Sequence, residues 1–418
     1  MRKKLREIAG NNVQLAFIYT ALQSFGRGIW MGNILSLYIV VFAEMSDGVF
    51  GLTPNELLGV ASGITGVSMT ALVFPSGYFA DRFGRDKMLR LASLIGISAM
   101  MTLIFSADII PIFVALFLWG AFQGISRPAF ESIFADSVPT GNRSGIYSKL
   151  HLVRQAGMAV GPFLNIILFF HLGDEWDISI LRTVMIFGIV FSLISSVLLL
   201  LFKDDRSLGH ESESLVENRG DESEAELKLS KRRRRIPLLL TSSNLIVGMG
   251  AGMTVRFFPV FFRAVYSMKP TDVQLVMGIT FIFTGTFAIL AQKFSVKKGR
   301  VEIMLASKLT ATLFLFIIAF YPPLWLLLPL FILRGSLMNS AEPLSRSILM
   351  DAVPKRNRGK WNSVQTISWG LFWNASAVIG GFLIGEDNFS LCFFVTAGVY
   401  AVGSIPLFFL IPLVNRES

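Results

Sequence analysis

Residues 77–90 read GYFADRFGRDKMLR, a charged run that stands between two long apolar stretches. Before it lies LGVASGITGVSMTALVFPS, and after it lies LASLIGISAMMTLIF. A helix needs about 20 apolar residues to cross a hydrocarbon core. Two apolar stretches joined by a tight, basic turn with a glycine therefore predict two membrane helices and the loop between them.

The composition extends this interpretation to the whole chain of 418 residues. It is 53% hydrophobic and 16% charged, with a mean hydropathy of +0.61, whereas a soluble domain is about 25% charged. We expect an all-α membrane protein with twelve transmembrane helices. The predicted spans are 13–42, 56–80, 88–106, 109–136, 147–171, 179–202, 237–263, 273–293, 302–320, 323–351, 361–385 and 390–413.

The basic residues predict the orientation. They gather in the terminal arms and in the loops after even-numbered spans, whereas the opposite loops hold only Arg182, Arg263 and Lys269. Cytoplasmic loops carry the excess of lysine and arginine, so both termini and the 77–90 turn are expected in the cytoplasm, with the plasma membrane as the expected location. The net charge of +10 lies in these short connections, which argues against nucleic acid as a partner. The first apolar run is too long for a signal peptide.

Sequence similarity between the halves predicts a duplication. Residues 128–143 read PAFESIFADSVPTGNR and residues 343–358 read PLSRSILMDAVPKRNR, with eight identities at one shift of 215 positions. The same shift maps Gly84–Arg85 onto Gly299–Arg300. We expect two pseudo-symmetric six-helix bundles in parallel repeat.

The predicted bundles span residues 1–202 and 237–418, and a linker at 203–236 joins them. The linker reads as acidic in HESESLVENRGDESEAE and as basic in KLSKRRRR. It has few apolar residues to bury, so we predict that it is disordered and cytoplasmic. The basic residues 231–235 either fix the topology as solvated charges or contact anionic lipid headgroups.

The 77–90 turn resembles the cytoplasmic signature between helices two and three of the major facilitator superfamily. The resemblance covers the chain: twelve spans, a long central loop and paired halves. In the second copy, Val296 replaces the aspartate and only Gly299 and Arg300 remain. The resemblance implies a secondary transporter that moves a small solute by alternating access, without a cofactor, and we expect a monomer that is not an enzyme.

Within this signature we predict a cytoplasmic latch. A carboxylate at the end of span two can meet the positive end of another helix, and arginines can bond across the loop. The resemblance implies that the partner is span eleven, near Lys360–Asn362. The alternative is that the arginines only follow the positive-inside bias. The latch residues are Gly77, Asp81, Arg82, Gly84 and Arg85.

Charged residues inside spans four and ten suggest an ionic gate. Span four carries Arg127 and Glu131, and span ten carries Glu342 and Arg346 at the same shift of 215 with the signs exchanged. Ionisable residues in a span are costly and usually functional. We hypothesise that Arg127 faces Glu342 and that Glu131 faces Arg346 across the pseudo-two-fold axis. The alternative is a local pair within each helix.

Polar residues in other spans are candidates for a substrate cavity. Arg27 in span one and Arg256 in span seven either contact an anion or reach toward the membrane surface. Span five contains Gly157–Pro162, which resembles the end of an antiporter signature of drug-exporting members. Close helix packing is the alternative there. The other cavity candidates are Gln23, Asn33, Tyr38, Gln123, Arg334, Asn339, Trp369, Trp373 and Asn374.

The substrate class therefore stays open between an organic anion and a drug-like compound. Glu131 and Glu342 are the acids that proton coupling would use. A transporter-like receptor or scaffold that moves nothing is the remaining alternative. The single Cys392 and three scattered histidines give no metal-ligand spacing, so no metal and no catalytic residue are expected.

Overall fold

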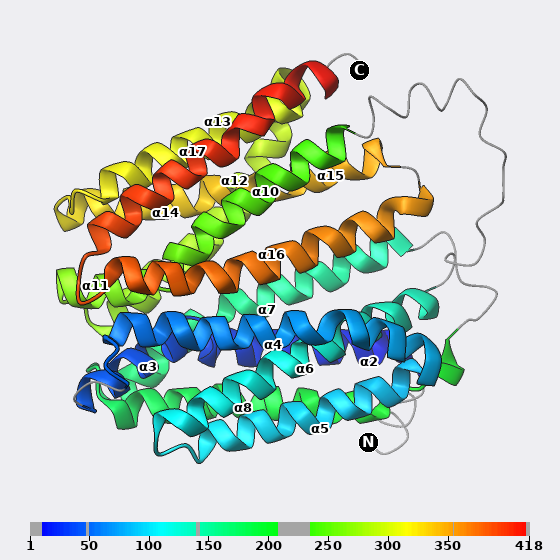
Figure 1. Ribbon diagram of the computed structural model, residues 1–418, viewed down its shortest axis with the longest axis horizontal. Helices are drawn as coiled ribbons and strands as arrows, with labels where there is room; N and C mark the ends of the chain where they lie inside the picture. The colour runs from blue at the N-terminus through cyan, green and yellow to red at the C-terminus, as the bar shows by residue number, and fades with distance from the viewer. Residues whose placement is uncertain (1–10, 47–49, 139–142, 208–234, 354, 415–418) are drawn as a thin grey trace. The chain divides into compact units, whose positions relative to one another are not determined.

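A computed structural model describes residues 11–46, 50–138, 143–207, 235–353 and 355–414 (Figure 1). These residues are organised in helices, and they contain no β-strand. Eleven helical segments among them are long and apolar enough to cross a membrane, and the shorter apolar helix Gly370–Ile384 lies in the predicted eleventh span. The predicted all-α membrane fold is confirmed.

The chain divides into two compact units. The first unit comprises Met1–Asn218 with Lys269–Gln274, and the second comprises Arg219–Met268 with Leu275–Ser418. The helices of the first unit are α2 (Asn12–Trp30), α3 (Asn33–Met45), α4 (Pro54–Phe83), α5 (Arg85–Ile104), α6 (Ile109–Ser137), α7 (Arg143–Leu172) and α8 (Ile178–Leu198), followed by the short helices η1 (Leu199–Leu201) and η2 (Asp204–Arg206).

The second unit is likewise built of helices, and its α12 begins within the Lys269–Gln274 segment of the first unit. Its helices are α10 (Arg235–Thr254), α11 (Phe258–Tyr266), α12 (Pro270–Lys298), α13 (Arg300–Ile318), α14 (Leu324–Ser340), α15 (Glu342–Ala352), α16 (Lys355–Ile384) and α17 (Phe389–Val414). In the first unit α2 packs on α7 and α8, and in the second α10 packs on α16 and α17.

Helix starts follow local sequence signals. At α4 the Thr53 hydroxyl accepts the backbone N–H of Glu56, while the Glu56 carboxylate accepts the N–H of Thr53 at 2.8 Å, which forms a capping box. At α8 the Asp177 carboxylate accepts hydrogen bonds from the Ser179 hydroxyl and from the backbone of Ser179 and Ile180. These bonds stabilise the charged form and lower the pKa of Asp177.

Three predicted spans are interrupted, although the sequence suggested continuous helices. Proline lacks an N–H and its ring clashes with the preceding turn, so it favours the start of a helix over the interior. Pro259 and Pro343 are each the second residue of the helix that follows the break, and Gly32 precedes α3. The breaks separate α2 from α3 in span one, α10 from α11 in span seven and α14 from α15 in span ten.

Glycines bring α2 and α7 into backbone contact. A Cβ on Gly157 would lie 2.8 Å from the Ser24 Cβ, and a Cβ on Gly161 would overlap the backbone of Gly28. The glycines of span five therefore serve close helix packing in this unit. The second unit has an equivalent contact, because Cβ atoms on Gly252 and Gly380 of α10 and α16 would also overlap backbone atoms of the facing helix.

Candidate functional site

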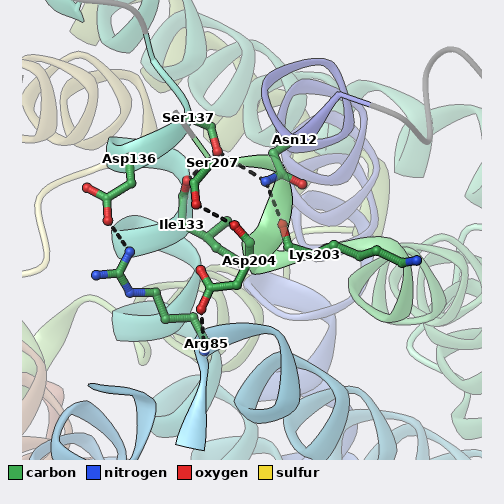
Figure 2. Close-up of polar contacts among 8 residues, drawn as sticks. All are labelled: Asn12, Arg85, Ile133, Asp136, Ser137, Lys203, Asp204 and Ser207. Atoms are coloured by element: carbon green, nitrogen blue, oxygen red, sulfur yellow. Dashed lines mark hydrogen bonds and ion pairs between the residues drawn. The ribbon is translucent and has the colours of Figure 1, made fainter. Parts of the chain in front are cut away.

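The signature turn is held by two carboxylates of the first unit (Figure 2). The Arg85 guanidinium forms an ion pair with Asp136 at the end of α6. The backbone N–H of Arg85 donates to the Asp204 carboxylate at 3.1 Å. Gly84 has a φ of +97°, which favours glycine. The sharp turn between α4 and α5 is therefore fixed to α6 and to η2.

The start of the predicted linker belongs to the same polar network. The Asn12 amide donates to the Ser137 hydroxyl at 3.1 Å and to the Lys203 carbonyl at 2.9 Å. Figure 2 shows these bonds beside the Arg85–Asp136 pair. Residues 203–207 are thus ordered against the first unit, and the linker residues 208–234, including most of the basic stretch, lie outside the described residues.

The second unit repeats this ion pair at the predicted shift. Arg300 donates to Asp351 at 2.5 Å and to the Ser347 hydroxyl at 2.8 Å, and Gly299 has a φ of +95°. Each of these residues lies 215 positions after its counterpart in the first unit. The sequence repeat therefore corresponds to a repeated structural contact, although Val296 has replaced the signature aspartate.

The other latch residues are less constrained. The Arg82 guanidinium lies 5.6 Å from the Phe83 ring centroid, and a Cβ on Gly77 would meet no atom within 4 Å. The side chain of Asp81 lies outside the described residues. Contact with span eleven stays a prediction, while Arg85 is engaged within its own unit.

The predicted gate residues differ between the units. In α15 the Arg346 guanidinium donates to Glu342 at 2.8 Å, so the local alternative holds for this pair. In α6 the structure describes both Arg127 and Glu131, and these two residues form no ion pair within 4.0 Å. Both α6 side chains are exposed. The interaction across the pseudo-two-fold axis stays a prediction.

The two predicted cavity arginines lie at interruptions of their spans. Arg27 is in the last turn of α2, and Arg256 lies in the break between α10 and α11. Arg256 Nη2 donates to the Asn374 amide oxygen at 2.7 Å. Its Nε is buried and makes no hydrogen bond within the described part of the chain. Broken helices often border substrate sites in transporters.

Other cavity candidates make contacts inside their own units. Arg334 is 4% exposed, donates to the Tyr400 hydroxyl at 2.9 Å and lies 4.9 Å from the Phe258 ring centroid. Asn339 donates to the Gly335 carbonyl, and Gln23 accepts from Ser195. These contacts satisfy some of the polar atoms locally, but the buried Nε of Arg334 makes no hydrogen bond within the described part of the chain.

The remaining cavity candidates lie in α3, α6 and α16. Asn33 begins α3 directly after the break in span one. Gln123 is 8% exposed in α6, and Tyr38 is buried in α3. Trp373 lies beside the Gly252 contact of α16. The side chain of Trp369 lies outside the described residues.

The sequence analysis missed a buried lysine in span nine. Lys308 is 4% exposed, and its ammonium lies 3.3 Å from the Asn244 amide oxygen and 3.4 Å from the Ser243 hydroxyl. Asn244 donates in turn to Ser345 at 2.9 Å, and Glu342 acts electrostatically on Lys308. An ionisable residue in an apolar span was the available signal. Arg154 in span five was missed for the same reason.

These helices and breaks define a multi-pass integral membrane protein built from two repeated units, the architecture of secondary transporters. The family model of the Major Facilitator Superfamily matches residues 16–269 and 240–418. The chain belongs to this superfamily. Its members are transporters and not enzymes, which confirms the resemblance found in the signature.

Relatives and solved structures agree with this assignment. The chain is 27% identical over 175 residues to the Na(+), Li(+), K(+)/H(+) antiporter of Planococcus maritimus, covering 40% of this chain and 37% of that protein. It is 28% identical over 184 residues to Multidrug resistance protein 2 of Bacillus subtilis (strain 168), covering 43% and 42%. The chain thus spans about two fifths of the length of both relatives. The structure of the D-xylose-proton symporter superposes with a TM-score of 0.71 at 16% identity, over 94% of this chain and 96% of that chain.

Proposed function

We propose that this secondary transporter moves a small organic anion by alternating access of its two units. The observation that carries the proposal is Arg256, an arginine in the break of span seven that donates a hydrogen bond to the neutral amide of Asn374. A guanidinium at this depth is costly without a negative partner. An anionic substrate supplies that partner with charge-assisted hydrogen bonds.

The half-helix ends support the same assignment. The backbone N–H groups at the start of a helix carry partial positive charge, and α3 and α11 both begin directly after the breaks. Anionic groups bind at such helix starts. Arg27 and Arg256 add full positive charges close to these two positions. We further propose that both termini are cytoplasmic, that the protein acts as a monomer in the plasma membrane, and that an ion gradient drives transport.

Replacing Arg256 by glutamine should lower anion uptake at least about tenfold, because loss of one charge-assisted bond costs roughly 1.5–3 kcal/mol. Uptake is measured in proteoliposomes with the anion, from a panel of radiolabelled carboxylates and phosphate esters, that the wild type moves fastest. Arg256→Lys should retain part of the activity. The control Arg90→Gln alters an exposed arginine that pairs with Asp86 at 3.1 Å, and it should transport normally.

Export of lipophilic compounds is the second candidate, favoured by the similarity to a multidrug resistance protein. The same vesicles distinguish the two functions. Wild-type transport of ethidium without uptake of any anion on the panel would contradict the anion proposal. Transport of neither class, together with ligand binding, would favour the receptor or scaffold alternative.

We also propose that the gate charges of α6 and α15 interact during transport. Arg127→Glu should reduce uptake about tenfold or more, since a repelling charge then faces Glu342. Adding Glu342→Arg should restore part of the uptake. If the double variant is no better than Arg127→Glu alone, the charges act locally within each helix, as the Glu342–Arg346 pair does.

A further inference from the structure

Three arginines from three helices gather around one tyrosine of the first unit. Arg27 of α2, Arg127 of α6 and Arg154 of α7 all act electrostatically on Tyr19 of α2. Arg127 and Arg154 also act on each other. Like charges repel one another, so a negatively charged ligand would be attracted to these groups. Arg27, Arg127, Arg154 and Tyr19, named here the arginine cluster, thus bring three positive charges close to one phenol.

Helix packing brings the members of the arginine cluster together. The Tyr19 and Phe130 rings lie with centroids 4.9 Å apart, which places Arg127 one turn of α6 from Tyr19. A Cβ on Gly157 would lie 2.8 Å from Ser24, which places Arg154 one turn of α7 from that contact. The geometry therefore places these side chains on adjoining turns of three neighbouring helices.

The cluster lies well inside the spans. Arg127 precedes the last residue of α6, Ser137, by ten residues, and Arg154 follows the first residue of α7, Arg143, by eleven. At 1.5 Å per residue these positions are about 15 Å from the cytoplasmic ends predicted for both helices. Lipid headgroups beyond those ends are poorly placed to neutralise both charges at this depth.

Arg127, Arg154 and the Tyr19 hydroxyl have few partners among the described residues. Glu131 is the carboxylate that acts on Arg127, but it forms no ion pair with it within 4.0 Å. Neither Arg127 nor Arg154 hydrogen-bonds to another described residue, and both side chains are exposed. The described chain likewise contains no hydrogen bond to the Tyr19 hydroxyl. The guanidinium groups of Arg127 and Arg154 and the Tyr19 hydroxyl are thus available to bind one ligand.

We propose that the arginine cluster is a binding site for the doubly charged group of an anionic substrate, as in a phosphate monoester or a dicarboxylate. Arg127 and Arg154 bind its oxygens with bidentate hydrogen bonds, the Tyr19 hydroxyl donates another, and Arg27 adds to the attraction. The Glu131 carboxylate repels any anionic ligand. A singly charged ligand gains less attraction from the arginines to offset this repulsion, so the site should prefer a doubly charged ligand. This inference rests on the proposed anion transport and names its substrate class.

The experiment compares ligands of one shape and two charges on the purified full-length protein. Phenyl phosphate at pH 8 carries about two negative charges, whereas phenyl sulfate has the same ester oxygen and three terminal oxygens with one. Isothermal titration calorimetry should show that phenyl phosphate binds at least about tenfold more tightly than the singly charged ligand, a difference in binding free energy of roughly 1.4 kcal/mol. Phthalate against benzoate repeats the comparison for carboxylates and shows whether the site prefers either chemistry.

Variants then assign the preference to the arginine cluster. Arg154→Gln and Arg127→Gln should each reduce the tenfold preference to about threefold or less, while Arg154→Lys should retain more of it, since it keeps the charge. Arg90→Gln is the matched control and should bind as the wild type does. Thermal unfolding checks that each variant is folded, and Arg154→Lys remains informative if a glutamine variant is not.

Three results would overturn the site: equal binding of both charges, a preference that survives both glutamine substitutions, or no binding of either dianion. The proposed function fails separately. Anion uptake that depends on Arg256 without any preference for dianions refutes only the arginine cluster. Dianion binding that depends on Arg154, in vesicles that transport no anion, refutes only the transport proposal.

Discussion

Protein in which Gly161 is replaced by alanine should fail to fold or unfold at a much lower temperature. The added Cβ would overlap the backbone of Gly28, and backbone atoms in a packed helix pair have no alternative rotamer. Overpacking a core usually costs about 1–3 kcal/mol, and separation of α2 from α7 adds lost packing along both helices. The measurement is thermal unfolding of the detergent-purified protein, followed by size-exclusion chromatography.

Gly398→Ala is the matched control for this substitution. Gly398 lies inside α17, and a Cβ there would meet no atom within 4 Å. Alanine is better than glycine in a helix by about 0.8–1 kcal/mol, so this variant should be as stable as the wild type or slightly more stable. A Gly161→Ala protein that unfolds at the same temperature as Gly398→Ala would show that α2 and α7 are farther apart than described.

Loss of the Arg85 side chain should strongly impair both stability and transport. Arg85→Ala removes the ion pair between Arg85 and Asp136, whose side chain is 19% exposed. Removing one member of a buried pair costs about 3–5 kcal/mol, and this partly exposed pair should cost roughly 2 kcal/mol. Proteoliposome uptake should fall at least about tenfold as the turn between α4 and α5 loosens. The exchanged pair Arg85→Asp with Asp136→Arg should recover part of both properties.

The internal repeat supplies the control for Arg85. Arg300 makes the equivalent pair with Asp351, but these side chains are 35% and 62% exposed. Exposed pairs contribute about 0–1 kcal/mol, so Arg300→Ala should reduce stability much less than Arg85→Ala. Equal losses of stability in the two variants would mean that burial of an ion pair does not determine its contribution to stability.

The duplication was predictable, whereas the contacts it creates were not. The shift of 215 positions predicted both the repeat and the equivalence of Gly84–Arg85 with Gly299–Arg300. That Arg85 pairs with Asp136 depends on how α5 packs against α6, which residue types and spacing do not determine. Arg334 shows the same limit, because its hydrogen-bond partner Tyr400 lies 66 positions later in the chain.

The broken spans had a weaker signal. Pro259 and Pro343 stand at the breaks of spans seven and ten, but Pro128 lies inside the continuous helix α6. Neighbouring helices in a membrane protein can satisfy the carbonyl that a proline leaves free, so proline alone does not predict a break. Lys308 and Arg154 could have been found from sequence, since each is an ionisable residue inside an apolar span.

Asp204 gives the central connection a mechanical role. Its carboxylate fastens residue 204 to the backbone of Arg85, and the Asn12 amide fastens Lys203 nearby. Residues 203 and 204 are therefore fixed both to the corner between α4 and α5 and to the start of α2. The chain that follows Ser207 therefore starts from a fixed point of the first unit, beside the corner between α4 and α5.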